Sequence, residues 1–216
     1  MKPKSNPLSG VRVLVGRAHH QASALSTSLR SLGAEVLEIP FIEIRRPQSF
    51  QPLDQALKKL DSYDWMILTS VNGVEAILKR MEELDLSRQQ PANLKIAAIG
   101  PATKTALEKC GFKVHVVPKQ YVAESVVESL RDRVTGKRIL LARAKVARDV
   151  IPEQLRQAGA HIDVVEAYET VIPKSGREKL KEVLNDKNLR PHVITFTSSS
   201  TVKNFVALLN SDQGIN

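Results

Sequence analysis

The chain has 216 residues, 25% of them charged and 42% hydrophobic, and 32 lysines and arginines against 23 aspartates and glutamates give a net charge of +9. These fractions are typical of globular proteins and exclude disordered and fibrous classes. No apolar run approaches the roughly 18 residues that a membrane span needs, so we expect no membrane partner. The basic balance favours an acidic partner: nucleic acid, an anionic surface or a polyanionic small molecule.

Strand-like and helical patterns alternate along the chain. Gly33 and Gly111 stand where a helix C′ residue belongs. Strands that alternate with short helices predict parallel βαβ units and an open α/β sheet. The predicted elements are, in order, strands at Val11–Gly16 and Val36–Ile39 around a helix at Gln21–Leu32, a strand at Trp65–Thr69, a helix at Val74–Arg80, a strand at Lys95–Ile99, a helix at Ala102–Lys109, a strand at Lys113–Val117 and a helix at Ser125–Arg131.

An internal repeat links the two halves of the chain. VRVLVGRA (11–18) resembles KRILLARA (137–144), and the same offset of 126 carries SLGAEV (31–36) onto QAGAHI (157–162). ILTSVNGVEAI (67–77) matches TFTSSSTVKNF (195–205) at an offset of 128. The offset of 126 also carries FIE (41–43) onto AYE (167–169). Four matching blocks in one order predict a duplicated α/β unit. The counterpart of 95–118 would lie beyond Asn216, so we expect the second copy to be truncated at its C-terminus and its sheet to be incomplete.

Two similar segments occupy equivalent places in the repeat. PFIEIRRP (40–47) and EAYETVIP (166–173) both alternate apolar and polar residues and end in proline, which limits continuation of a strand ladder. They predict a two-stranded linker between a discontinuous first domain, 1–40 with 172–216, and a second domain, 47–166. A cleft between two such lobes is the default ligand site.

Familiar catalytic and metal-binding motifs are missing from the sequence. It holds no GxxxxGK[ST], GxGxxG or HExxH pattern, and the adjacent His19 and His20 have no second His/Cys cluster near them. We therefore expect no metal and no cofactor. The single cysteine, Cys110, is interpreted as an inert packing residue that fits a reducing compartment. The first residues, MKPKSNPLSG, lack the apolar stretch of a secretory signal, so a cytoplasmic location is expected.

Small hydroxyl residues recur where a strand leads into a helix. Examples are TSVNG (69–73), TSSST (197–201) and IGPAT (99–103). At the carboxyl end of a parallel strand, the free N–H groups and dipole of the following helix favour an anion, although the same residue types also serve as plain N-caps. Both interpretations stay open for each site. The candidate ligand-binding residues are Ser70, Asn72, Thr103, Ser198 and Ser199.

Two further residue types could reach such a ligand. Arg17 and Arg143 follow the first strand of each copy, where a guanidinium could enter the cleft or simply lie on the surface. Tyr168 lies on the predicted linker, where its phenol could donate a hydrogen bond to a leaving group or could pack against the ladder. The basic stretch 131–148 has no interleaved aromatics, so we interpret it as a solvated face and expect no nucleic-acid partner.

As an ordered set, these segments resemble the uroporphyrinogen-III synthase family. The resemblance runs from VRVLVGRA to FTSSSTVKNFVALL and includes both hydroxyl-rich turns, AIGPAT and EAYETVIP. It implies two flavodoxin-like domains joined by a two-stranded ladder. It also implies a monomeric lyase that cyclises hydroxymethylbilane, an octa-carboxylate, to uroporphyrinogen III with loss of water and inversion of ring D.

The resemblance also assigns roles to individual residues. The family's crossover tyrosine falls on Tyr168, the threonine of its GPxT-type turn on Thr103, and its strand-end hydroxyls on Ser70 and on Ser198 or Ser199. The second GPxT-type turn would lie beyond Asn216. Two alternatives remain: a non-catalytic two-lobed protein that binds a polyanionic small molecule, and a nucleic-acid-binding protein.

Overall fold

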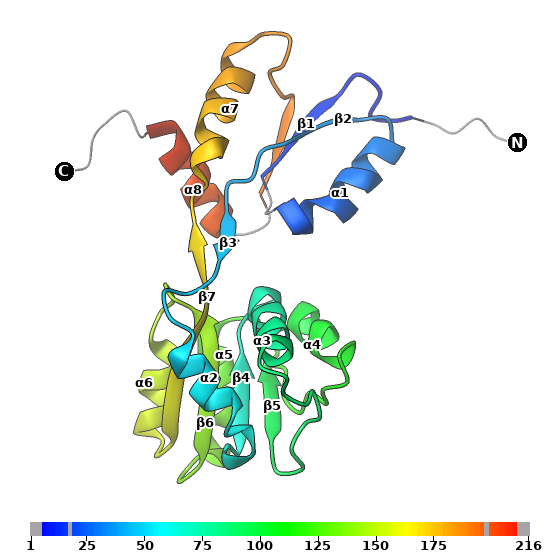
Figure 1. Cartoon of the computed structure of the whole chain (residues 1–216). Helices are drawn as coiled ribbons and strands as arrows, with labels where there is room; N and C mark the ends of the chain where they lie inside the picture. Colours follow the sequence, from blue (N-terminus) through cyan, green and yellow to red (C-terminus); the bar gives the residue numbers. More distant parts are fainter. Residues whose placement is uncertain (1–5, 17–18, 197–198, 211–216) are drawn as a thin grey trace, which may run out of the picture. The chain divides into compact units, whose positions relative to one another are not determined.

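The chain forms two compact units, described from a computed structural model of residues 6–16, 19–196 and 199–210 (Figure 1). The first unit joins Met1–Ile44 to Thr170–Asn216, and the second is the continuous segment Arg45–Glu169. Two strands cross the boundary between the units, β3 (Glu43–Arg45) and β7 (His161–Val171). No helix among the described residues is long and apolar enough to cross a membrane.

The first unit is built on a parallel sheet with the strand order β2-β1-β8. Alternation along β1 divides its core in two, because successive side chains of a strand point to opposite faces. Val13 and Val15 pack with residues of α1, whereas Leu14 packs with residues of α7 and α8. The elements of this unit are β1 (Arg12–Val15), α1 (His19–Ser31), β2 (Glu35–Glu38), α7 (Lys174–Asn185), β8 (Val193–Thr195) and α8 (Ser199–Asn210).

The second unit carries the larger sheet, with the strand order β3-β7-β6-β4-β5. The strands β7, β6, β4 and β5 are parallel to one another. All four residues of β4 are buried, which is expected of a central strand covered on both faces. The other elements of this unit are α2 (Gln51–Leu57), η1 (Leu60–Ser62), β4 (Trp65–Leu68), α3 (Val71–Glu83), β5 (Lys95–Ala98), α4 (Pro101–Glu108), α5 (Ala123–Leu130), η2 (Arg131–Arg133), β6 (Arg138–Ala144) and α6 (Val150–Gln157).

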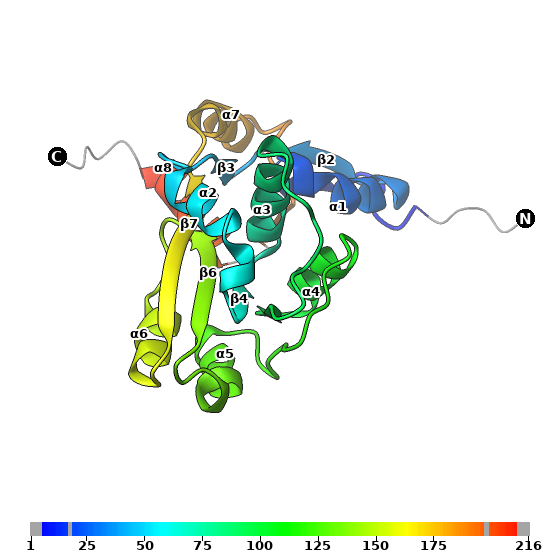
Figure 2. The same cartoon turned by 60° about the horizontal axis from the view of Figure 1, so that its bottom comes forward.

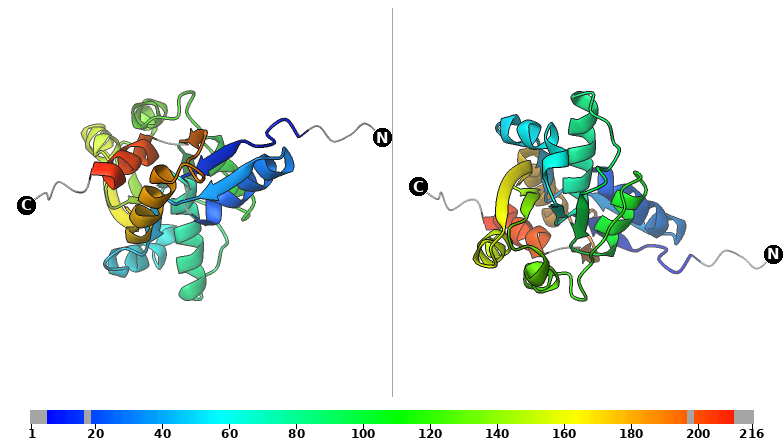
Figure 3. Two further views of the ribbon diagram at one scale, coloured as in Figure 1. Left: turned by 90° about the horizontal axis from the view of Figure 1, so that it is seen from above. Right: turned by 90° about the horizontal axis from the view of Figure 1, so that it is seen from below.

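Helices cover both faces of this second sheet (Figures 2 and 3). The helices α5 and α6 pack over one face, where Ile139, Leu141 and Ile162 join their apolar side chains in one core cluster. The helices α2 and α3 lie on the opposite face (Figure 2), and α4 packs against α3. The expectation of an α/β fold with parallel sheets is therefore confirmed.

One predicted strand was wrong in extent. The segment Lys113–Val117 forms only an isolated bridge between Ala97 and Val116. Backbone hydrogen bonds still join it to β5: His115 and Val116 donate their N–H groups to the Ile96 carbonyl, and Ala98 donates its N–H to the Val116 carbonyl. Side chains limit the ladder, because the Ile96 N–H goes to His115 Nδ1 at 3.1 Å and the Lys113 N–H goes to Gln90 Oε1 at 2.7 Å. Backbone groups that are paired with side chains cannot also pair with a neighbouring strand.

Candidate functional site

Three of the residues singled out from the sequence meet at the start of α3. The Tyr168 hydroxyl lies 2.8 Å from Ser70 Oγ, and the side chain of Asn72 also hydrogen-bonds to the phenol. Ser70 is the N-cap of α3, where its Oγ accepts the backbone N–H of Gly73 at 3.0 Å. The serine therefore caps its helix and contacts the tyrosine at the same time, and its role in ligand binding stays a prediction.

A β-bulge positions the tyrosine. In the β6–β7 pairing Arg143 faces Glu166 and Ala144 faces Tyr168, which leaves Ala167 as an extra residue on β7. Strict alternation would place Tyr168 on the same face as Ile162 and Val164, which pack on the α5–α6 side. The extra residue turns the phenol toward the start of α3 instead. Bulges re-aim side chains in this way.

The phenol is buried and protonated. Only 7% of Tyr168 is exposed. Burial raises the pKa of the Tyr168 hydroxyl above its ordinary value, while the hydrogen bonds to Ser70 and Asn72 pull the pKa in the opposite direction. Because burial dominates, the group keeps its proton near neutral pH and can donate a hydrogen bond.

An ion pair lies next to this tyrosine. Lys145 donates its backbone N–H to the carbonyl of Tyr168 at 2.9 Å, and its Nζ lies 2.8 Å from Glu169 Oε1. The pairing raises the pKa of Lys145 and lowers the pKa of Glu169, so both groups stay charged at neutral pH. These contacts hold the end of β7 against the end of β6.

A pocket of about 210 Å³ opens at the carboxyl ends of the neighbouring strands β4, β5 and β6. Thr69, Ile99 and Arg143, each next to or at the end of its strand, contribute to its wall. The open crevice at this edge of a parallel sheet is the usual ligand position in α/β proteins. Arg143 is bound to Asp149, which agrees with a structural role for this guanidinium.

Sequence reasoning missed two residues that line this pocket. Tyr121 is 60% exposed and lies against Gly100, the N-cap of α4. Arg148 also lines the pocket and is paired with Glu124 at 2.7 Å. Neither residue belongs to a repeat block or a strand-end turn. The one signal in the sequence was that Tyr121 is one of only three tyrosines.

The structure describes the remaining candidate ligand-binding residues only in part. Thr103 is buried in the first turn of α4, which begins directly after β5, at the same edge of the sheet as Ser70. Arg17 and Ser198 lie outside the described residues, and Ser199 begins α8 without a described side chain. Among the described residues, no group of three or more His, Cys, Asp or Glu could hold a metal ion.

The fold is that of an α/β protein of two units with parallel sheets. A buried tyrosine lies on β7, the strand that runs from the second unit into the first. Residues 23–215 match the family described as uroporphyrinogen-III synthase HemD. The chain belongs to this family of lyases, which act in porphyrin biosynthesis as hydro-lyases.

Individual relatives agree with that assignment. The uroporphyrinogen-III synthase of Synechococcus elongatus is 36% identical over 210 residues, which span 97% of this chain and 78% of that protein. A mutant uroporphyrinogen III synthase from Thermus thermophilus has a similar structure, with a TM-score of 0.58 over 93% of this chain and 99% of that one, at 16% identity. The synthetase from Helicobacter pylori gives a TM-score of 0.56 over 92% and 78%, at 18% identity. These two structures support the fold.

Proposed function

We propose that this chain cyclises hydroxymethylbilane to uroporphyrinogen III, with loss of water and inversion of ring D, and that Tyr168 assists departure of the hydroxyl group. The family supplies the reaction, and the Tyr168–Ser70–Asn72 cluster is the observation that carries the residue assignment. A protonated phenol held by two polar neighbours is a suitable hydrogen-bond donor to a leaving hydroxyl.

The cyclisation of hydroxymethylbilane needs few reacting side chains. Loss of the hydroxyl gives an azafulvene cation, which cyclises unaided without inverting ring D. The protein must therefore hold ring D so that attack occurs at its substituted carbon and forms a spiro intermediate. Holding the reactants in the productive geometry can supply most of the catalysis. This demand agrees with a sequence that lacks familiar catalytic motifs.

Helix N-termini supply a means of holding the eight carboxylates of the substrate. The helices α3 and α4 begin at the carboxyl ends of β4 and β5, so their N-terminal N–H groups and dipoles lie at one edge of the sheet. We propose that Ser70, Asn72 and Thr103 contact substrate there. Substrate contacts by Arg17, Ser198 and Ser199 of the first unit remain predictions. The net charge of +9 favours association with such an anion.

The strand orders support an internal duplication, which we propose as the origin of the two flavodoxin-like units. The repeat blocks carry β1 onto β6, β2 onto the start of β7, and β8 onto β4. The order β2-β1-β8 of the first sheet then corresponds to the order β7-β6-β4 within the second. In this scheme the segments 40–47 and 166–173 are the linkers between two copies. A monomeric, cytoplasmic protein remains a prediction.

The product isomer tests the proposed activity. The chain is incubated with freshly prepared hydroxymethylbilane, and the type I and type III uroporphyrinogens are separated after oxidation. We expect type III product well above the level of a protein-free control. Bilane that binds to the protein but yields only type I product would contradict the synthase assignment and support a binding protein.

A further inference from the structure

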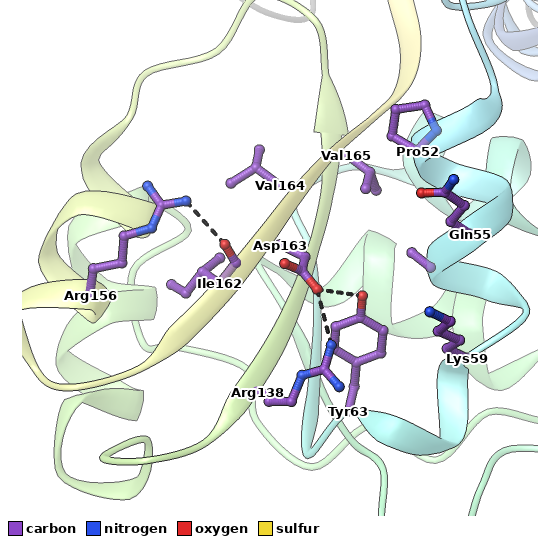
Figure 4. Close-up of a pocket in the computed structure, with 11 residues that line it drawn as sticks. Pro52, Gln55, Lys59, Tyr63, Arg138, Arg156, Ile162, Asp163, Val164 and Val165 are labelled. Carbon is purple, nitrogen blue, oxygen red and sulfur yellow. Dashed lines mark hydrogen bonds and ion pairs between the residues drawn. The ribbon is translucent and has the colours of Figure 1, made fainter.

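A second pocket lies in the same unit, at the opposite ends of the strands. Its volume is about 410 Å³, nearly twice that of the pocket at the carboxyl edge. Tyr63 precedes β4, Arg138 begins β6, and Asp163 is the third residue of β7, so the pocket opens at the amino edge of the sheet (Figure 4). Further walls come from Arg156 on α6 and from Lys59, the N-cap of η1, which lies two residues after the end of α2.

This pocket is separate from the tyrosine cluster. Asp163 and Tyr168 are five residues apart on one strand, which places them roughly 16 Å apart at about 3.3 Å per residue. No residue lines both the 410 Å³ pocket and the 210 Å³ pocket, as far as the described residues go. A ligand here would not touch the groups assigned to the cyclisation.

The one carboxylate of the pocket already has partners. Asp163 Oδ2 accepts the Tyr63 hydroxyl at 2.6 Å and lies 3.5 Å from the Arg138 guanidinium, which also lies over the Tyr63 ring at 5.1 Å. Burial, and then the hydrogen bond to Asp163, raise the pKa of Tyr63 well above its ordinary range, so the phenol adds no negative charge. The negative charge of Asp163 is therefore already paired with the positive charge of Arg138.

Two cations of the pocket are left without a carboxylate. In the described part of the chain, neither Lys59 nor Arg156 forms an ion pair. The backbone N–H of His161 donates to the carbonyl of Lys137, the residue before β6. Backbone groups alternate in direction along a strand, so those of Ile162 point away from β6. There the Ile162 carbonyl accepts one N–H of Arg156 at 3.0 Å, which fixes the guanidinium at the pocket wall and leaves its other donors available (Figure 4).

Apart from the Gln55 amide, the remaining lining residues are apolar. Pro52 and Ala56 from α2, and Val164 and Val165 from β7, contribute apolar parts of the wall. A pocket of this size with several converging polar groups is typical of small-molecule sites. We propose that it binds a compact organic dianion, with two carboxylate or phosphate groups on a small apolar body, whose charges are held by Lys59 and Arg156. This site goes beyond the proposed synthase activity and does not depend on it.

Titration calorimetry at low ionic strength tests the site with two probes, isophthalate for the dicarboxylate and inorganic pyrophosphate for the phosphate chemistry. We expect isophthalate to bind, since it has an apolar body, and Lys59→Gln and Arg156→Gln each to weaken it about tenfold or more. Pyrophosphate binding tighter than isophthalate would assign the site to phosphate groups and overturn the role of the apolar walls. If neither probe bound at about 10 mM, the proposed site would be overturned.

Matched controls separate this pocket from the general basic charge. Lys58→Gln removes the same charge one residue away, outside the pocket, and should leave binding unchanged. An equal loss in Lys58→Gln and Lys59→Gln would overturn the proposal, and this pair decides the outcome even if Arg156→Gln does not fold. Tyr168→Phe should bind the probe normally, so a failure of the synthase proposal and a failure of this one are distinguishable.

Discussion

At the residue scale, the catalytic proposal depends on the position of one hydroxyl group, that of Tyr168. The Tyr168 phenol is buried, and Ser70 still has the N–H of Gly73 when that phenol is removed. We therefore expect Tyr168→Phe to fold normally, with a loss in free energy of unfolding of about 1 kcal/mol. Its turnover should fall about a hundredfold or more, the contribution of a positioned proton donor.

The isomer assay and thermal unfolding measure these two effects separately. Ser129→Ala is a suitable control, because it removes a hydroxyl that only bonds the Ser125 carbonyl within α5. It should leave the type III yield as in the unmodified chain. Near-normal turnover of Tyr168→Phe would contradict the role given to the phenol.

A close approach in the first unit sets a second residue-scale prediction. A Cβ atom added at Gly16 would overlap Cδ2 and Cε2 of Phe41, a fully buried ring that also packs on Phe205 at 5.0 Å between centroids. Gly16→Ala should lower the free energy of unfolding by about 1–3 kcal/mol, the usual effect of overpacking. Urea denaturation measures it.

A double mutant shows whether the ring is the cause. Leucine at position 41 is smaller, so Phe41→Leu combined with Gly16→Ala should cost less than the sum of the two single changes. Simple additivity, within about 0.5 kcal/mol, would mean that the contact with Phe41 does not limit this position.

At the scale of elements, a bidentate ion pair joins α2 to α3. Arg80 holds both carboxylate oxygens of Asp54, at 2.6 and 2.7 Å, and its guanidinium lies 4.4 Å from the centre of the Phe50 ring. The hydrogen bond from Arg80 lowers the pKa of Asp54 below its ordinary 3.8, although partial burial opposes this. The pair therefore stabilises the folded state above pH 3.8 and loses this effect as the pH falls through the lower, folded value.

Asp54→Asn isolates that contribution from the other carboxylates. At pH 7 the variant should be less stable by about 1 kcal/mol, because the charge-assisted hydrogen bonds are lost. The difference between the two proteins should shrink as the pH falls below 3.8. Urea denaturation between neutral and acidic pH gives both curves, and a difference that stays constant to the lowest pH would contradict the assignment.

Sequence periodicity predicted best those elements whose buried residues follow a regular pattern. Trp65–Leu68 is an uninterrupted apolar run and forms a central strand, and Val71–Glu83 has its N-cap serine in the expected place. The helices α2, α6 and α7 were not predicted. Pro52 and Pro152 fall in the first turns of α2 and α6, where they weaken the helical pattern of the sequence. A proline is tolerated there because the first N–H groups of a helix have no intrahelical partner.

The sequence predicted individual residues of the candidate site but not the contact between them. Ser70 and Asn72 were visible as a strand-end turn and Tyr168 as a rare aromatic, but their contact depends on the extra residue Ala167 in β7. A bulge leaves no pattern in a single sequence. The amino-edge pocket was invisible for a related reason, because Tyr63, Asp163 and Arg156 come from segments that only the strand order brings together.

At the scale of the whole molecule, each unit has core clusters of its own among the described residues. The main cluster of the second unit runs from Trp65 to Ile162 and contains no residue of the first, while the clusters around Val13 and Leu14 contain none of the second. The second unit is also one continuous segment, Arg45–Glu169, that begins and ends on the neighbouring strands β3 and β7. A segment with its own core and adjacent ends has the properties of an autonomous domain.

We therefore expect the fragment Arg45–Glu169 to fold by itself. It should unfold in urea in a single cooperative transition, as small single domains do. It should also keep the Tyr168–Ser70 contact, because both residues and the paired strands β6 and β7 lie within it. Circular dichroism and a dispersed amide NMR spectrum measure the fold, and a Ser70→Ala change that shifts the Tyr168 ring signals measures the contact. A fragment without cooperative unfolding would show that the second sheet depends on strand residues supplied by the first unit, such as Glu43 and Ile44 of β3.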